Sequence, residues 1–253
     1  LAYSDGIPAE ALGGSPARTL DDELASLRAR GDTGATVVPL FLGPSGGLAR
    51  KVAECKRQLQ EESDPHAQPF DLQVGACLVD EEDLSDTRVA RAIASNVLWT
   101  ARRNRFSGPL RVLVVDHGTP SRRVNAVRER LAREVRTLLG HRALEVRGAS
   151  MERRDGPEFD FNEPLLERAL GVPPFHEGNV IVAMAFLLPG RHAGEGGDVA
   201  DIIEEACEKH QHKLSVHTTP LLASHSLVLQ VLADRVRQIE AGALVAAVSG
   251  KLR

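Results

Sequence analysis

Five apolar runs along the chain have the length and composition of β-strands. Three of them, residues 36–42, 110–115 and 179–188, are nearly continuous and rich in β-branched residues. Two weaker runs lie at 70–79 and 213–222. A strand that is apolar on both faces is typical of a parallel sheet covered by helices on each side. The runs therefore predict an α/β fold.

Between these runs, apolar residues recur every three or four positions, which is the period of an amphipathic helix. Residues 121–139, 198–209 and 224–239 follow this pattern. Ser121 and Asp198, which open the first two segments, belong to the residue types that cap helix N-termini. Strands that alternate with helices predict right-handed β–α–β crossovers.

Two segments of the chain resemble each other. VVPLFLGPSGG (37–47) aligns with VAMAFLLPGRH (182–192), and in both an apolar run ends in Phe-Leu-x-Pro before a loop. We therefore expect two similar α/β halves, at residues 1–105 and 106–253. Nothing in the first half corresponds to the run 110–115 and the helix after it, so we expect this half to lack its first strand and helix.

The composition narrows the class of protein. The chain has 31 Lys and Arg against 35 Asp and Glu, a net charge of −4, so we expect no nucleic-acid partner. It has no apolar run long enough to span a membrane. Its three cysteines are far apart and predict free thiols rather than disulfides or a zinc site. No signal peptide is visible, which favours the cytoplasm, although the chain begins at Leu1 and can be a piece of a longer protein.

Two histidines follow predicted strands of the second half. His117 lies in an Asp-His-Gly-Thr turn directly after 110–115, and His192 lies a few residues after 179–188. Ligands bind at the carboxyl ends of strands in open parallel sheets. Imidazole is a favoured ligand of divalent iron, cobalt, nickel and zinc. Each histidine alone fits a structural role, whereas the pair at equivalent strand ends predicts a metal or catalytic site.

These segments resemble the class II tetrapyrrole chelatases, and most closely their sirohydrochlorin chelatase (CbiX-like) group. AMAFLLPGRHAGEGGD (183–198) is similar to the second signature of the family. The first signature, HG[ST] followed by Arg and Asn, is matched by His117, Gly118, Thr119, Arg122 or Arg123, and Asn125. The resemblance covers most of 110–240 and, more loosely, 20–103.

The resemblance implies two flavodoxin-like halves with a cleft between them. It implies insertion of Co²⁺ or Fe²⁺ into sirohydrochlorin or a related tetrapyrrole, in cobalamin or sirohaem biosynthesis, with His117 and His192 as metal ligands. The metal is then a substrate, no organic cofactor is implied, and the tetrapyrrole is the expected partner. The sequence leaves open the choice of metal, the exact macrocycle and the oligomeric state.

The chemistry of metal insertion suggests roles for individual side chains. Two imidazoles can hold an ion weakly, leave positions for the macrocycle nitrogens and accept the two pyrrole protons. We expect Glu195, in a Gly-rich loop, to assist His117 and His192 in catalysis, whereas Asp198 fits either a helix cap or the site. Three guanidinium groups are candidates for binding the substrate carboxylates: Arg122, Arg123 and Arg191.

Two departures from the family pattern matter. Gly47 stands where the second half has His192, so we expect no metal site in the first half. The loop after His192 reads AGEGGDV rather than the short His-x-x-x-Asp-Ile-Pro of close sirohydrochlorin chelatases, so the sequence does not identify the substrate.

Two alternative classes of protein remain. One is a non-catalytic relative that binds and delivers a metal or a tetrapyrrole, and the other is a different two-half α/β binding protein.

Overall fold

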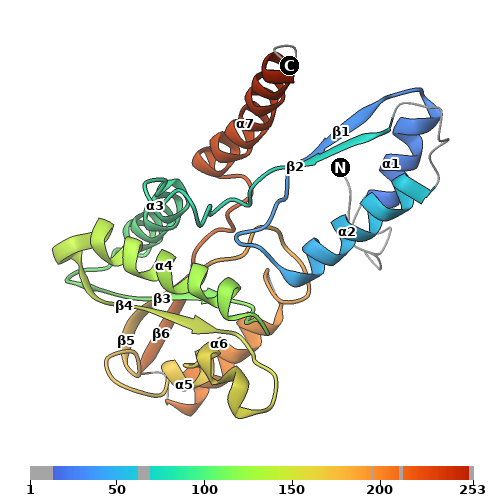
Figure 1. Ribbon diagram of the computed structural model, residues 1–253. Coiled ribbons are helices and arrows are strands. Elements are labelled where there is room, and N and C mark those ends of the chain that lie inside the picture. The colour runs from blue at the N-terminus through green and yellow to red at the C-terminus, as the bar shows by residue number, and fades with distance from the viewer. Residues whose placement is uncertain (1–13, 62–68, 195, 211–212, 251–253) are drawn as a thin grey trace. The chain divides into compact units, whose positions relative to one another are not determined.

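The computed structural model describes residues 14–61, 69–194, 196–210 and 213–250 of the chain (Figure 1). The chain divides into two compact units, which we describe separately. The small unit comprises Leu1–Pro39, Ser45–Ala76 and Arg235–Arg253, and the large unit comprises Leu40–Pro44 and Cys77–Asp234. Each unit contains a parallel sheet, so the expected α/β class is confirmed.

The small unit is built around one pair of strands. β1 (Gly34–Val37) pairs in parallel with β2 (Asp71–Val74). Two helices, α1 (Leu20–Ala29) and α2 (Gly46–Glu61), provide the remaining core residues. The predicted strand 36–42 is too long, because β1 ends at Val37 and Pro39 has no N–H to donate to a strand ladder.

The thiol of Cys55 is buried in the core of the small unit. It donates a hydrogen bond of 3.0 Å to a carboxylate oxygen of Asp21. Burial and this carboxylate raise the pKa of Cys55 to about 12, because both disfavour the thiolate. All three cysteines are free, as the sequence predicts.

The large unit contains a four-stranded parallel sheet in the order β4-β3-β5-β6. Its strands are β3 (Leu110–Asp116), β4 (Ala143–Ser150), β5 (Gly178–Met184) and β6 (Leu214–Thr218). β3 lies between β4 and β5, and its residues 112–115 are completely buried. This central position explains why the run 110–115 shows no polar alternation.

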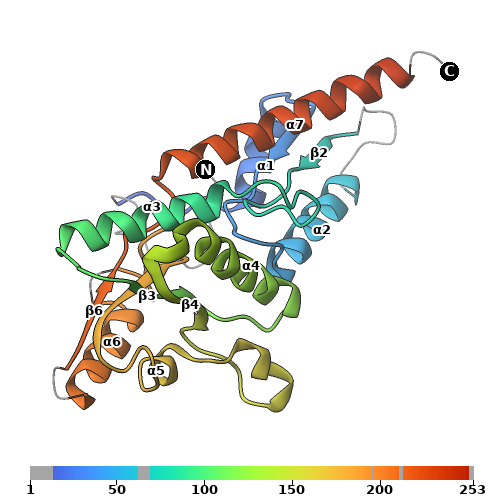
Figure 2. The ribbon, with the colours of Figure 1, turned by 90° about the vertical axis from the view of Figure 1, so that its left-hand side faces the viewer.

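Helices cover both faces of this sheet (Figure 2). Val112 and Val114 pack with α3 (Arg88–Arg103) and α4 (Arg122–Leu139). Leu113 and Val115 point to the other face, as successive residues of a strand do, and pack with α5 (Leu166–Ala169) and α6 (Asp198–Lys209). Within the residues that the structure describes, two 3₁₀ helices and a long final helix complete the set of elements: η2 (Gly140–Arg142), η3 (Pro157–Asn162) and α7 (Ser226–Gly250).

The helices predicted at 121–139 and 198–209 are confirmed as α4 and α6. Asp198 is not the N-cap of α6, however. Gly197 occupies that position and Asp198 is the first helical residue. The apolar runs do not predict β4, because Glu145 and Arg147 interrupt the apolar sequence of this edge strand.

The two packing units differ in extent from the two sequence halves. α3 precedes residue 105, yet its apolar face packs on the sheet of the large unit through Val89, Ile93 and Val97. The units are defined by contacts and the halves by sequence similarity, so the division into 1–105 and 106–253 stays a prediction.

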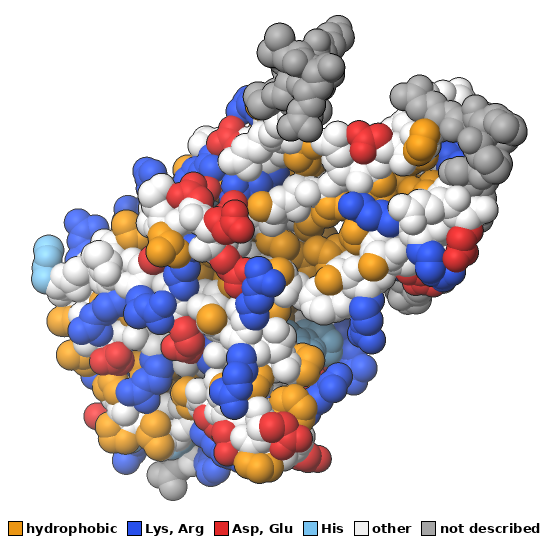
Figure 3. All heavy atoms as spheres, viewed as in Figure 1, with side chains coloured by type: hydrophobic (Ala, Val, Ile, Leu, Met, Phe, Trp, Pro, Cys, Tyr) orange, Lys and Arg blue, Asp and Glu red, His pale blue; other side chains and the backbone are white. Residues whose placement is uncertain are grey.

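Charged side chains of both signs are interspersed over the face of the molecule turned to the viewer in Figure 3. This mixture agrees with the small net charge of −4. Among the described residues, no helix combines the length and the apolar character that crossing a bilayer requires.

Candidate metal centre

The imidazole rings of His117 and His192 lie against each other in the large unit. Their centroids are 4.5 Å apart and their planes meet at 74°, an edge-to-face contact. His117 directly follows β3, and His192 lies in the loop after the neighbouring strand β5. The side chains are 44% and 34% exposed, so solvent reaches both rings. The structure thus brings together the two histidines that the sequence singles out.

The ring of His117 is oriented by the backbone. Its Nδ1 lies 3.1 Å from the carbonyl oxygen of Gly118, which can only accept, so the proton of this contact is on Nδ1. Nε2 then carries the lone pair. A carboxylate oxygen of Glu152 lies 3.4 Å from this Nε2. Two electron-rich atoms placed this way favour a cation between them.

The ring of His192 is oriented by a carboxylate. Nδ1 of His192 lies 2.6 Å from an oxygen of Asp198 and donates to it. Asp198 begins α6, where the helix dipole stabilises a negative charge. A histidine that binds a metal through one ring nitrogen usually donates the other N–H to a carbonyl or a carboxylate. Both rings have this arrangement.

A glycine with a left-handed backbone conformation forms the turn after His117. Gly118 has a φ of +94°, and a Cβ at this position would lie 1.9 Å from the carbonyl oxygen of Glu152. Around this close approach, the N–H of Glu152 donates to the carbonyl of His117 at 3.1 Å. The main-chain contact holds Glu152 beside the imidazole ring.

The base of this turn is fastened by the buried carboxylate of Asp116. Its Oδ1 accepts hydrogen bonds of 3.1 Å from the N–H of Gly118 and from the hydroxyl of Ser150. The guanidinium group of Arg128 is buried 3.5 Å from the same oxygen and also donates to Ser150. Burial raises the pKa of Asp116, while the charge of Arg128 and these hydrogen bonds act against that rise.

Asn162 holds the next residue of the loop. Its side-chain oxygen accepts from the N–H of Thr119, and its amide nitrogen donates to the carbonyl of Thr119, both at 2.9 Å. The same nitrogen donates to the carbonyl of Phe159 at 3.1 Å. Asn162 is fully buried, so these bonds are shielded from water and keep the loop in one conformation.

The other predicted site residues differ in their surroundings. Arg122 lies over the ring of Phe161, 4.6 Å from its centroid. Arg123 forms an ion pair with Glu81. Arg191 is 84% exposed, and its guanidinium lies 3.8 Å from Asp198. Glu195 lies outside the described residues.

Sequence reasoning missed Glu152, Arg128 and Asn162. Glu152 follows β4 at the same end of the sheet as His117, so recognising that strand would have identified it. Nothing in the sequence pattern marks Arg128 or Asn162. Within the described ranges, no three His, Cys, Asp or Glu side chains close around one position that could hold a metal. An ion held by the two imidazoles would therefore keep open coordination positions.

The large unit is similar in sequence to a known protein family. A family model described as CbiX matches residues 111–239, about half of the chain, including both histidines. No curated protein matches the chain in sequence.

Two solved structures are similar in fold. SirB from Bacillus subtilis with Fe³⁺ is 16% identical with a TM-score of 0.59, and the match covers 91% of this chain and 84% of SirB. DR2241 from Deinococcus radiodurans, described as a multi-domain protein with structural similarity to chelatases and two additional novel domains, is 18% identical with a TM-score of 0.52. That match covers 80% of this chain and 41% of DR2241.

Proposed function

Because the chain belongs to the CbiX family, we propose that it inserts a divalent metal ion into a tetrapyrrole of the sirohydrochlorin type. The observation that carries this proposal is the contact between His117 and His192, each with Nδ1 engaged in a hydrogen bond. The proposed metals are Co²⁺ and Fe²⁺, both of which accept imidazole ligands. The proposed setting is the cytoplasmic biosynthesis of cobalamin or sirohaem.

In this proposal the two Nε2 atoms bind the incoming ion and present it to the face of the macrocycle. Two protein nitrogens leave coordination positions to which the pyrrole nitrogens bind as the ion is transferred. Glu152, beside His117, adds a negative charge that favours the cation. The metal enters as a substrate and leaves in the product, so no resident metal or organic cofactor is required.

Insertion replaces two pyrrole N–H bonds by metal–nitrogen bonds and releases two protons. We assign the first acceptor role to the imidazoles, which become free to take up protons as the ion leaves them. Glu152, 3.4 Å from Nε2 of His117, receives one proton and passes it to water, because its side chain is exposed. Glu195, three residues after His192 in the sequence, stays a candidate for the same role.

The substrate carries carboxylates, and guanidinium groups bind carboxylates through paired hydrogen bonds. Arg122 and Arg191 are the better candidates for this contact. Arg122 stacks on Phe161 and has no ion pair within the described ranges, and Arg191 is 84% exposed with Asp198 as a distant partner at 3.8 Å. Arg123 would first have to release Glu81.

The direct test is an anaerobic spectral assay of Co²⁺ and Fe²⁺ insertion into sirohydrochlorin. We expect wild-type protein to accelerate insertion, and His117→Ala and His192→Ala to lose most of this acceleration. His210→Ala is the matched control, because His210 lies at the C-cap of α6 away from the ring pair. Unchanged rates in both site variants would refute the assignment, and metal binding without insertion would indicate a delivery protein instead.

A further inference from the structure

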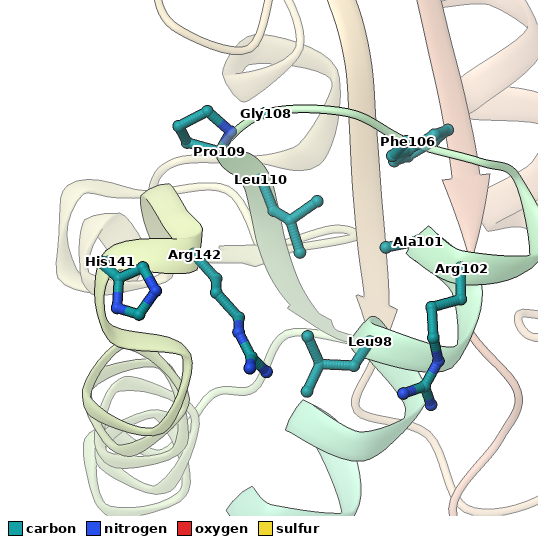
Figure 4. A pocket seen from close by; sticks show the side chains of 9 residues that line it. All are labelled: Leu98, Ala101, Arg102, Phe106, Gly108, Pro109, Leu110, His141 and Arg142. Atoms are coloured by element: carbon teal, nitrogen blue, oxygen red, sulfur yellow. The ribbon is translucent and has the colours of Figure 1, made fainter.

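A pocket of about 560 Å³ lies where β3 begins, at the end of the strands opposite to the histidine pair. Its lining includes Leu98 and Arg102 of α3, Phe106, Leu110 and, from η2, His141 and Arg142 (Figure 4). The seven residues of β3 separate it from His117 by about 20 Å, given the rise per residue of a strand. The volume is in the range of small-molecule sites.

The wall of this pocket is apolar and two of its side chains are cationic. Leu98, Phe106 and Leu110 provide the apolar surface. Arg102 and Arg142 come from different elements, and Figure 4 shows their side chains extending in the same direction on either side of Leu98. An apolar wall between two guanidinium groups is complementary to a molecule with an apolar body and a negative end.

Several other arginines of the large unit are paired with carboxylates. Arg88 binds Asp86 and Asp234, and Arg130 binds Glu134. Arg102 and Arg142 make no side-chain hydrogen bond or ion pair with any residue that the structure describes. The C-terminal dipole of α3 favours a cation at Arg102, but it does not account for a second guanidinium, from η2, beside the same apolar wall.

We propose that this pocket binds a small organic carboxylate with an apolar body. A guanidinium group and a carboxylate form two parallel hydrogen bonds, a paired contact that the compact ammonium group of lysine does not make. Two arginines therefore favour a carboxylate as the ligand. The apolar body lies against Leu98, Phe106 and Leu110 and removes their surface from water. The proposal does not depend on the metal chemistry at the other end of β3.

Hexanoate is the probe, with hexan-1-ol, acetate and inorganic phosphate as comparisons. We expect saturable binding of hexanoate by calorimetry, with NMR shifts confined to the residues around Phe106 and Arg142. Loss of charge-assisted hydrogen bonds predicts at least about tenfold weaker binding to Arg102→Gln/Arg142→Gln. The matched control is Arg91→Gln/Arg133→Gln, which removes two exposed arginines from α3 and α4 and should bind as wild type.

The binding experiments distinguish the proposed carboxylate site from each alternative. If hexan-1-ol, acetate or phosphate bound as tightly as hexanoate, the pocket would not require both a negative charge and an apolar body, and the proposal would be overturned. Equal affinity in Arg102→Gln/Arg142→Gln, or no saturable binding, would overturn the site. The variant His117→Ala/His192→Ala should bind hexanoate as wild type, and a loss there would place the probe at the histidine pair. The histidine variant therefore tests the pocket independently of the proposed metal insertion.

Discussion

Nδ1 of His192 lies 2.6 Å from a carboxylate oxygen of Asp198, and Asp198 is the first residue of α6. The N-terminus of α6 and the N–H of the imidazole both face this carboxylate with positive partial charge. The carboxylate in turn makes the opposite ring nitrogen a better electron donor. One residue therefore connects the start of a helix to the proposed metal ligand.

Asp198→Asn keeps a hydrogen-bond acceptor beside His192 and removes its charge. We expect Co²⁺ to bind about 10- to 100-fold more weakly, the usual effect of losing such a supporting group. Visible spectroscopy of Co²⁺ titrations measures this affinity. Asp201→Asn, in the same first turn of α6, should bind Co²⁺ as wild type. An equal loss in both variants would point to the helix rather than to the histidine.

Glu152→Gln tests the transfer of protons from His117. The amide keeps the size of the side chain but cannot accept a proton, so we expect kcat for metal insertion to fall about 100-fold. The Co²⁺ affinity should fall much less than kcat. Glu158→Gln, in η3, is a control with the same chemical change. If Glu152→Gln lowers only the metal affinity, Glu152 acts as a ligand and not as the proton acceptor.

Gly118→Ala places a methyl group against the carbonyl of Glu152 at a φ of +94°. We expect the free energy of unfolding to fall by about 3 kcal/mol or more, because a steric clash adds to the strain of positive φ. Gly108→Ala is the control. Gly108 has a φ of +85° with no atom within 4 Å of the added Cβ, so only strain of about 1–2 kcal/mol applies. Urea denaturation measures both, and equal losses would contradict the close approach.

Cys55 should resist alkylation in the folded protein. Its pKa of about 12 keeps the thiol protonated, and its side chain is buried, whereas Cys207 is partly exposed. We expect iodoacetamide at pH 8 to modify Cys207 first, and urea to make Cys55 reactive. In the unfolded protein the thiol has its ordinary pKa of 9.0, so it ionises at a lower pH than in the folded protein. The contribution of Cys55 to the free energy of unfolding is therefore present below pH 9 and is lost as the pH rises toward 12. Equal labelling rates of Cys55 and Cys207 in the folded state would contradict the buried position.

The elements that the sequence predicts well are those whose own pattern determines their place. The run 110–115 is apolar except for Arg111 because β3 is central, and the regular spacing of Val127, Leu131 and Val135 identifies α4. β4 is different. It is an edge strand with Glu145 and Arg147 among its apolar residues, so its pairing with β3 depends on contacts that the sequence does not display.

The same limit applies to the candidate metal centre. His117 and His192 could be predicted because each follows a recognisable strand. Glu152 could not, because it follows β4. The role of Asp198 was open, since a carboxylate at the start of a helix suits both a cap and a hydrogen bond to a ring. Arg128 and Asn162 act through buried contacts between residues far apart in the chain, and no local pattern records such contacts.

The two sides of the histidine pair are held by different kinds of contact. His117 and Glu152 are joined by a main-chain hydrogen bond between the ends of two paired strands. On the other side, the carbonyl of His192 accepts a hydrogen bond of 3.2 Å from the N–H of Val199 in the first turn of α6. A substitution that shifts the start of α6 would therefore move one imidazole relative to the other while the sheet stays intact. In the proposed function, such a shift would change which ionic radius the pair prefers.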